Sequence, residues 1–285
     1  MHLFHVMTFF LAVFLVACSG TSQPVDNKDA GGKEGEKGGQ QAGQPKPGGV
    51  YTILSPADPD MLDPHKQSSI YTHNIIGLVY SKLLTYKTGP DVDYSDYVLT
   101  GDLAEDWEVS EDGKVYTFHL RKDAKWQNVP PVNGRPVVAE DVIATMERIR
   151  SLPGHQVYML EKVEKMEAPD QHTVVFTLKE PFAPFLNYMA NHYMWILPKE
   201  GIEGKFDLAT KAIGSGPFIL EKWEDNVEAI LKRNPDYYMK GKPYLDEIRI
   251  MVVPDQGARI AAFRTGQTES IGIISPREVE NLRKS

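Results

Sequence analysis

The residues of this chain that could perform covalent chemistry are few, and Ser215 is the first to consider. It stands in the run Gly214-Ser215-Gly216-Pro217. A hydrolase serine commonly sits in Gly-x-Ser-x-Gly, because the glycines allow a sharp turn between strand and helix. Here the second residue after Ser215 is Pro217, and no Asp–His pair follows to complete a triad. We therefore expect no catalytic residues and no enzyme.

Candidate metal ligands are also sparse. The eight histidines are scattered, with no His-Glu-x-x-His motif and no pair at helical spacing in the body of the chain, so no zinc site is predicted. An acidic run loosely matches a calcium loop, but Asp96 stands where such a loop needs glycine for its turn. The matching positions are Asp91, Asp93, Ser95, Tyr97 and Asp102. We expect no metal ion and no cofactor.

The single cysteine, Cys18, follows the apolar stretch 6–17. That stretch is shorter than the ~20 residues that span a bilayer and suits the core of a signal peptide. The run Leu15-Val16-Ala17-Cys18 is similar to a bacterial lipobox. This implies that residues 1–18 are a lipoprotein signal peptide, and that Cys18 carries a lipid at the outer face of the cytoplasmic membrane or in the periplasm. Residues 1–5 lack the usual Lys or Arg, and the alternative is a buried cysteine in a core helix.

Residues 19–49 have a different composition from the rest of the chain. They are rich in Gly, Gln, Lys, Glu and Pro and almost without large apolar residues. Such a segment cannot bury enough surface to offset its ordering entropy. We expect a disordered tether between a lipid anchor and a globular body.

The remaining residues, 50–285, are enough for one large domain or two small ones. Hydrophobic residues make up 41% of the chain and charged residues 25%, which is ordinary for a globular protein. The net charge of −8 argues against a nucleic-acid partner, since such binders concentrate Lys and Arg. With one cysteine, the chain has no internal disulfide, and we expect a monomer.

Strands and helices alternate along this body. Period-two alternation predicts strands at 115–120 and 173–178, with Tyr116, Phe118 and Leu120 on one face. Apolar residues at helical spacing predict a helix from Ile75 to Leu83 and another over 142–149, whose acidic pair Glu140-Asp141 complements the helix dipole. Further strands are expected at 227–233 and 248–253, and a helix at 259–263 that stops at Gly266.

The end of the chain carries a helix-start signal. Ser275 is followed by Pro276 and, three residues after the cap, by Glu278, the pattern of a capping box with proline at the first helical position. A helix is therefore expected to begin at Pro276. It has no stop signal before Ser285, and we expect the chain to be the front portion of a longer protein.

Several motifs, in order, give the chain a family resemblance. The motifs are Leu62-Asp63-Pro64-His65, Leu103-Ala104-Glu105-Asp106-Trp107, Asp112-Gly113-Lys114, Ala139-Glu140-Asp141-Val142, Gly214-Ser215-Gly216-Pro217-Phe218, Arg233-Asn234-Pro235-Asp236-Tyr237-Tyr238 and Tyr244-Leu245-Asp246-Glu247-Ile248. With them the chain resembles the bacterial extracellular solute-binding proteins of family 5, the peptide- and nickel-binding components of ATP-driven importers.

The resemblance implies an α/β fold like that of type II periplasmic binding proteins, with two lobes and an inserted subdomain. Residues 50–80 would begin lobe I, residues 81–198 would form the inserted subdomain, and residues 199–285 would return to lobe I. The second lobe would be absent from this chain. Such proteins close around a ligand held between the lobes.

The resemblance also implies a function and a set of ligand residues. The function is capture of dipeptides or oligopeptides for the permease subunits of an ABC transporter. The positions that match cleft-facing segments are Ser68, Ile70, Tyr158, Ser215 and Gly216. Each has an alternative: Ser68 caps the next helix, Tyr158 is a surface or core aromatic, and the glycines serve a tight turn.

Two other function classes stay open. The family includes nickel binders, and the aromatic stretch from Tyr188 to Trp195 leaves room for a nickel, heme or other small-solute carrier. Packing of that stretch into a core is the favoured interpretation. The second class is a surface sensor lipoprotein without a transport role.

Overall fold

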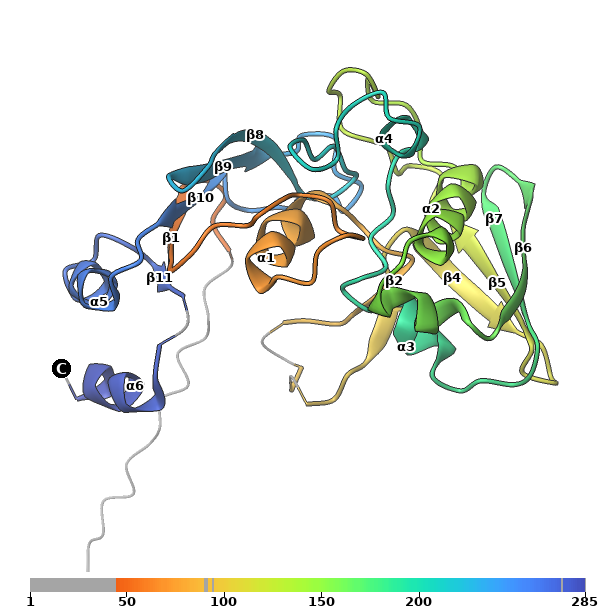
Figure 1. Ribbon diagram of the computed structural model, residues 1–285, viewed down its shortest axis with the longest axis horizontal. Helices are drawn as coiled ribbons and strands as arrows, with labels where there is room; N and C mark the ends of the chain where they lie inside the picture. Colours follow the sequence, from red (N-terminus) through yellow and green to blue (C-terminus); the bar gives the residue numbers. More distant parts are fainter. Residues whose placement is uncertain (1–44, 90–91, 94, 273, 285) are drawn as a thin grey trace, which may run out of the picture. The chain divides into compact units, whose positions relative to one another are not determined.

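The computed structural model describes residues 45–285, except residues 90, 91, 94, 273 and 285 (Figure 1). The chain from Pro45 onward forms one compact unit. The predicted signal peptide, Cys18 and most of the predicted tether lie outside the described residues, as does Asp91 of the calcium-like run. Within the described ranges, no helix has the length and apolar character needed to cross a bilayer.

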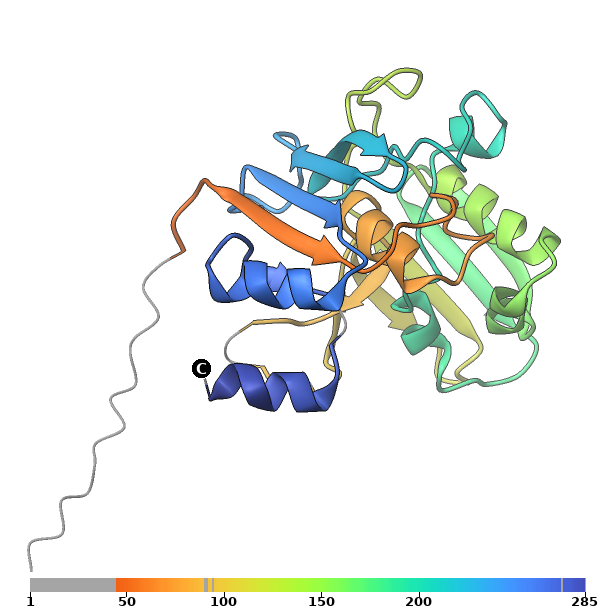
Figure 2. The ribbon, with the colours of Figure 1, turned by 60° about the vertical axis from the view of Figure 1, so that its left-hand side comes forward.

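The first main sheet collects strands from both ends of the described chain. Its strands, in the order β11-β1-β10-β9-β8, are β11 (Ser270–Ile271), β1 (Val50–Ser55), β10 (Glu247–Val252), β9 (Glu228–Arg233) and β8 (Phe218–Glu224). β1 runs parallel to β10 and to β11, whereas β9 is antiparallel to β10 and β8. Figure 2 shows β1 and β10 side by side. The two strands predicted at 227–233 and 248–253 are confirmed to within a residue.

Helices connect the parallel strands of this sheet. α1 (Ile70–Val79) follows β1, and α5 (Gln256–Arg264) links β10 to β11. The predicted extension of α1 to Leu83 is wrong, because Tyr80 is already extended, at φ −98° and ψ 163°. The Val79 carbonyl accepts a hydrogen bond from the Gly216 N–H at 2.8 Å, which satisfies one of the open carbonyls at the helix end. α5 ends at Arg264, and Gly266 has a positive φ of 69°, as the stop signal predicts.

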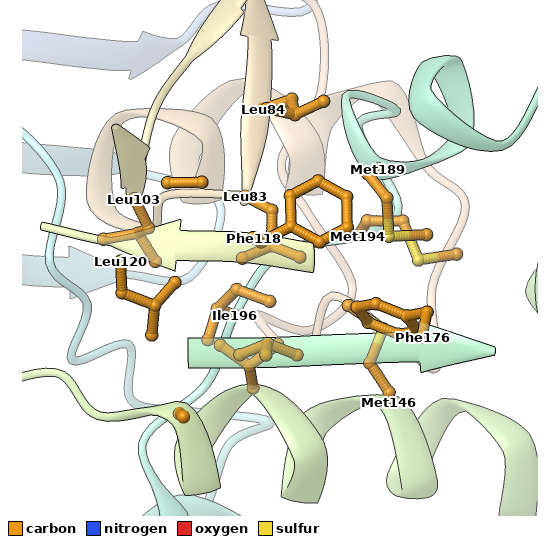
Figure 3. Close-up of a cluster of buried hydrophobic side chains, with 14 of the residues drawn as sticks. Leu83, Leu84, Leu103, Phe118, Leu120, Met146, Phe176, Met189, Met194 and Ile196 are labelled. Carbon is orange, nitrogen blue, oxygen red and sulfur yellow. The ribbon is translucent and has the colours of Figure 1, made fainter. Parts of the chain in front are cut away.

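The second main sheet is antiparallel and lies within the middle of the chain. Its strands, in the order β4-β5-β7-β6, are β4 (Ala104–Val109), β5 (Val115–Leu120), β7 (Thr173–Leu178) and β6 (Val163–Asp170). The alternation predicted for 115–120 and 173–178 is confirmed, with every second residue buried. Phe118 and Phe176 meet edge to face with ring centroids 5.7 Å apart, among the buried side chains of Figure 3.

Helices cover the buried face of the second sheet. α2 (Ala139–Ser151) and α3 (Phe185–Met189) contribute Val142, Met146 and Phe185 to the same core. Asp141, predicted to complement the dipole of α2, also anchors the start of this helix through buried contacts. Its carboxylate is fully buried, pairs with Arg135 at 2.7 Å, and accepts from the Trp126 indole and the Val138 N–H.

The remaining elements are short. They are β2 (Leu84–Tyr86), β3 (Leu99–Gly101), the 3₁₀ helix η1 (His155–Leu160), α4 (Lys199–Ile202) and α6 (Pro276–Arg283). The predicted start of α6 is confirmed: Ser275 is its cap, Pro276 is its first residue, and the Ser275 Oγ accepts from the Glu278 N–H.

The segments predicted as lobe I and as the inserted subdomain contribute their strands to different main sheets. The first sheet draws on residues 50–55 and 218–271, and the second on residues 104–178. Each sheet has its own cluster of buried hydrophobic residues. The proposed boundaries at 80/81 and 198/199 stay a prediction.

Candidate functional site

The topology of the first sheet indicates where a ligand would bind. The chain leaves β1 through α1 and returns to the sheet at β8, which lies on one side of β1. It leaves β10 through α5 and returns at β11, which lies on the other side of β1. The connections from the neighbouring strands β1 and β10 therefore run in opposite directions along the sheet. In open α/β sheets, the carboxyl ends of strands at such a switch point form the usual ligand crevice.

A cavity of about 450 Å³ lies beside β1, and its lining extends to the residues that follow the carboxyl end of this strand. Its floor is the inner face of the sheet, where Tyr51 and Ile53 of β1 stand next to Ile248 and Ile250 of β10. Residues 55–59, just after β1, and Ser270 and Gly272 of the β11 segment complete one side. The volume falls within the range of small-ligand pockets.

Helix α1 forms the opposite wall of the cavity. Ile76 and Val79, near its C-terminal end, pack into the first core with Phe218 and Leu231 of β8 and β9. Another face of the helix lines the cavity along most of its length, from Ile70, which is 53% exposed, to Leu78.

Asp58 is the one charged side chain among the described residues that line this largely apolar cavity. Asp58 accepts hydrogen bonds from the Trp223 indole, at 3.0 Å to Oδ2, and from the Asn226 N–H at 2.8 Å. These bonds tie the segment after β1 to the β8–β9 hairpin. Partial burial raises the pKa of the Asp58 carboxyl, since the charged form is desolvated.

A buried polar network fixes the loop between β1 and α1. The Asp63 carboxylate pairs with Arg148 of α2, at 2.6 Å between Oδ2 and Nη2. Arg148 also donates from Nη1 to His65 Nδ1 at 2.7 Å, and His65 Nε2 lies 3.0 Å from the Trp195 carbonyl oxygen. Because Nδ1 accepts, the proton of the neutral ring sits on Nε2. Burial and the neighbouring guanidinium lower the pKa of His65 to about 3.

The start of α1 is held by residues of the same loop. Ser69 caps the helix through its Oγ, which accepts from the Tyr71 N–H. The suggestion that Ser68 caps α1 is therefore wrong by one residue. Ser68 is exposed, and its N–H donates to the Gln67 side chain at 2.8 Å. It lies two residues before Ile70 but does not line the cavity.

Ser215 and Gly216 lie in the interior, away from the cavity lining. Both are buried, and the Ser215 Oγ has no hydrogen-bond partner among the described residues. A methyl group on Gly214 would lie 1.9 Å from the Val79 carbonyl oxygen, so only glycine allows this approach. The Gln127 side chain holds the turn by accepting from the Gly214 N–H and donating to the Phe218 carbonyl. The tight-turn interpretation accounts for these contacts, and a ligand role stays a prediction.

Tyr158 lies in η1, far along the chain from the cavity residues. It is 47% exposed, and its ring meets Tyr188 edge to face at 5.7 Å. It borders a separate open depression with Arg150 and Glu161. Of the five predicted ligand residues, the cavity therefore includes Ile70 alone.

The structure also bears on the metal and aromatic hypotheses. Among the described residues, no group of three or more His, Cys, Asp or Glu side chains could hold a metal ion. In the aromatic stretch, Met189 and Met194 are fully buried in the second core, and Tyr188 and Tyr193 pack against it. The interpretation of this stretch as core is confirmed.

The sequence reasoning missed Asp58 and Arg148. Asp63 and His65 were recognised within a family motif, but their partner lies 85 and 83 residues away. One available signal was Arg148, on the helix predicted over 142–149. The other was Asp58, an acidic residue in the segment that follows the end of β1 at Ser55, where switch-point sites form.

Taken together, an open α/β sheet with a switch-point cavity and a second sheet inserted after its first helix define a ligand-binding protein of the periplasmic-binding class. A family model for bacterial extracellular solute-binding proteins, family 5 (middle part), matches residues 98–285. The chain belongs to this family.

Named relatives support the same assignment. The chain is 33% identical over 244 residues to the probable D,D-dipeptide-binding periplasmic protein DdpA of Escherichia coli, covering 84% of this chain and 46% of the relative. It is 32% identical to di/tripeptide-binding protein 2 of Pseudomonas aeruginosa, covering 85% and 47%. The chain thus spans about half the length of the curated relatives it matches.

Solved structures agree with the fold. The periplasmic binding protein DppA from Helicobacter pylori, in complex with the peptide STSA, matches with a TM-score of 0.74 and 31% identity, over 85% of this chain and 50% of that one. The binding protein AgaA from A.tumefacien R10, in complex with agropinic acid, matches with a TM-score of 0.74 and 29% identity, over 83% of this chain and 46% of that one. The predicted fold class is confirmed.

Proposed function

We propose that this chain is part of an extracytoplasmic binding protein that captures dipeptides or oligopeptides and delivers them to the permease subunits of an ABC importer. The observation that carries the proposal is the apolar cavity at the switch point of a family 5 fold. Relatives about 30% identical are named dipeptide- or di/tripeptide-binding proteins, and one solved relative holds a peptide.

Capture would work by closure of two lobes, not by catalysis. Residues 50–80 and 199–285 form the first lobe, and residues 81–198 form a subdomain inserted into it. A ligand that contacts both lobes stabilises the closed state over the open one, and only that difference shifts the population. In this scheme the cavity beside β1 supplies one wall of the site, and a second lobe supplies the other.

The same proposal places the protein in the cell envelope. Relatives of the chain are named periplasmic. Cys18 would carry a lipid after removal of the signal peptide, and residues 19–49 would let the monomeric body reorient above the membrane. Mass spectrometry of the mature protein tests this point, because a diacylglyceryl group on Cys18 adds a defined mass that a Cys18→Ser variant lacks.

Native mass spectrometry of the protein as its gene encodes it tests the ligand class. We expect a population of bound peptides that is released on denaturation. A peptide-free protein with stoichiometric nickel would overturn the peptide assignment.

A second candidate is a carrier of another small solute. The observation in its favour is the 29% identity to AgaA, which is bound to agropinic acid and not to a peptide. Release of a single non-peptide compound in the same measurement would support this candidate and contradict peptide capture.

A further inference from the structure

Helix α1 presents an asparagine to the cavity. Ile70, Asn74 and Leu78 follow one another at four-residue spacing, share one face of the helix and line the cavity. Asn74 therefore stands one turn from an apolar residue on either side. Ser69 already caps α1, so Asn74 has no capping role, and asparagine inside a helix is less favourable than alanine. The stability of the helix does not account for an asparagine at this position.

The side-chain amide of Asn74 makes no hydrogen bond within the described part of the chain, and the residue is exposed. Two other polar groups of the lining are already engaged. The Ser55 Oγ donates to the Ala57 carbonyl at 2.6 Å, and the Asp58 carboxylate accepts from two N–H groups of the β8–β9 hairpin. Among the described lining residues, Asn74 alone carries an amide, which places a donor and an acceptor side by side.

The floor of the cavity offers few main-chain partners to a ligand. It is formed by Tyr51 and Ile53 of β1 and by Ile248 and Ile250 of β10. β1 pairs with β10 and β11, and β10 pairs with β1 and β9, so the N–H and C=O groups of both strands are largely used within the sheet. A peptide over this floor would lose the hydration of its own N–H and C=O groups, which is costly unless a side chain pairs with them.

We propose that the Asn74 amide pairs with the main chain of a bound peptide, donating from Nδ2 to one carbonyl oxygen and accepting at Oδ1 from one N–H. The inference rests on the proposed function and adds how the peptide is held. In an extended peptide the N–H and C=O of one residue point to the same side, so one planar amide reaches both. Every peptide has these groups, whatever its sequence, and the apolar remainder of the cavity is left for a ligand side chain.

The test compares Leu-Gly-Gly with its two ester analogues by isothermal titration calorimetry on the protein as its gene encodes it. Each ester replaces one peptide N–H by an oxygen atom, which removes a donor and weakens the adjoining carbonyl acceptor without adding bulk. We expect at least one ester to bind about tenfold more weakly than Leu-Gly-Gly. Asn74→Ala should weaken binding of Leu-Gly-Gly by a similar factor, because it removes the same contact from the protein side.

Two variants locate the effect. In Asn74→Ala, the weakly binding ester and Leu-Gly-Gly should bind within about twofold of each other, since the partner of the lost N–H is already absent. Asn187→Ala is the matched control: Asn187 is an exposed asparagine of α3, accepts from the Tyr86 hydroxyl at 3.1 Å and does not line the cavity. It should keep the full difference between ester and peptide. Thermal unfolding by circular dichroism shows whether each variant is folded.

The outcomes separate this inference from the proposed function. Equal binding of Leu-Gly-Gly and both esters by the unmodified protein overturns the inference and leaves peptide capture standing, whether or not Asn74→Ala folds. An ester penalty that persists in folded Asn74→Ala places the main-chain contact elsewhere and also overturns it. Failure of a wide range of peptides to bind overturns both.

Discussion

The Arg148 guanidinium and the Asp63 carboxylate pair at 2.6 Å, between Nη2 and Oδ2. The pair joins α2, which packs on the second sheet, to the loop that leads into α1 on the first. Both groups are largely withdrawn from water, with 11% and 3% of their side-chain surface exposed. A contact of this kind fixes the orientation of the loop that carries Ser68 and leads into α1 at Ile70.

Removing the Arg148 cation from this pair should lower the stability of the fold. We expect Arg148→Met to lower the free energy of unfolding by about 3 kcal/mol, because it leaves the Asp63 carboxylate buried without its partner. Lys66→Met is the matched control, since Lys66 lies 4.0 Å from the same carboxylate but is 55% exposed, and it should cost less than about 1 kcal/mol. Urea unfolding measures the loss of stability in both variants. Equal losses would contradict the stabilising role assigned to the Arg148–Asp63 pair.

His65 makes the stability of the fold depend on pH. Its folded pKa is lowered to about 3 from an ordinary 6.5, so the unfolded chain binds a proton between these values while the folded chain does not. The contribution of neutral His65 to the free energy of unfolding is therefore fully present above pH 6.5. It is lost as the pH falls toward 3, by up to about 1.4 kcal/mol per pH unit.

The variant His65→Gln isolates this effect. Glutamine can accept from Arg148 and donate to the Trp195 carbonyl but does not titrate. We expect urea unfolding at pH 7, 6, 5 and 4 to show a shallower decline for the variant than for the unmodified protein. Parallel curves would show that His65 is not the responsible group.

Local patterns predicted the regular elements well. The strands at 115–120 and 173–178 and the helix starting at Pro276 have the predicted bounds, because period-two alternation and a capping box act within a few residues. The end of α1 was missed. The apolar spacing continues to Leu83, but the contact of Gly216 with Val79 joins positions 137 residues apart, which no local pattern contains.

The candidate site was predicted less completely, for the same reason. Ile70, which the family resemblance offered as a ligand residue, lines the cavity. Asp58 reaches the cavity only because β1 and the β8–β9 hairpin belong to one sheet, which no local pattern shows. Ser215 and Gly216 carry a recognisable turn motif, yet the turn packs on the end of α1 and both residues are buried. A motif gives the residue types, and tertiary packing decides which of them reach the cavity.

The turn at Gly214 gives a packing prediction. We expect Gly214→Ala to lower the free energy of unfolding by about 3 kcal/mol, since its methyl group would lie 1.9 Å from the Val79 carbonyl oxygen and force the backbone to shift. Gly77→Ala, within α1, is the control: its methyl group would make an ordinary 3.4 Å contact with Trp195 and should leave stability unchanged or raise it. Thermal unfolding compares the two, and a tolerated Gly214→Ala would contradict the close packing.

The two partly exposed candidates, Ile70 and Tyr158, offer a direct test of where ligand binds. Ile70 lines the cavity and is 53% exposed, and Tyr158 is 47% exposed in a different depression, so glutamine at either position should leave folding intact. We expect Ile70→Gln to weaken binding of Leu-Gly-Gly about tenfold, because the apolar contact made on binding is lost. Tyr158→Gln should change it by less than about twofold. Calorimetry on both variants distinguishes the two locations. Loss of binding in Tyr158→Gln alone would show that the ligand binds at the inserted segment around η1 and not in the switch-point cavity.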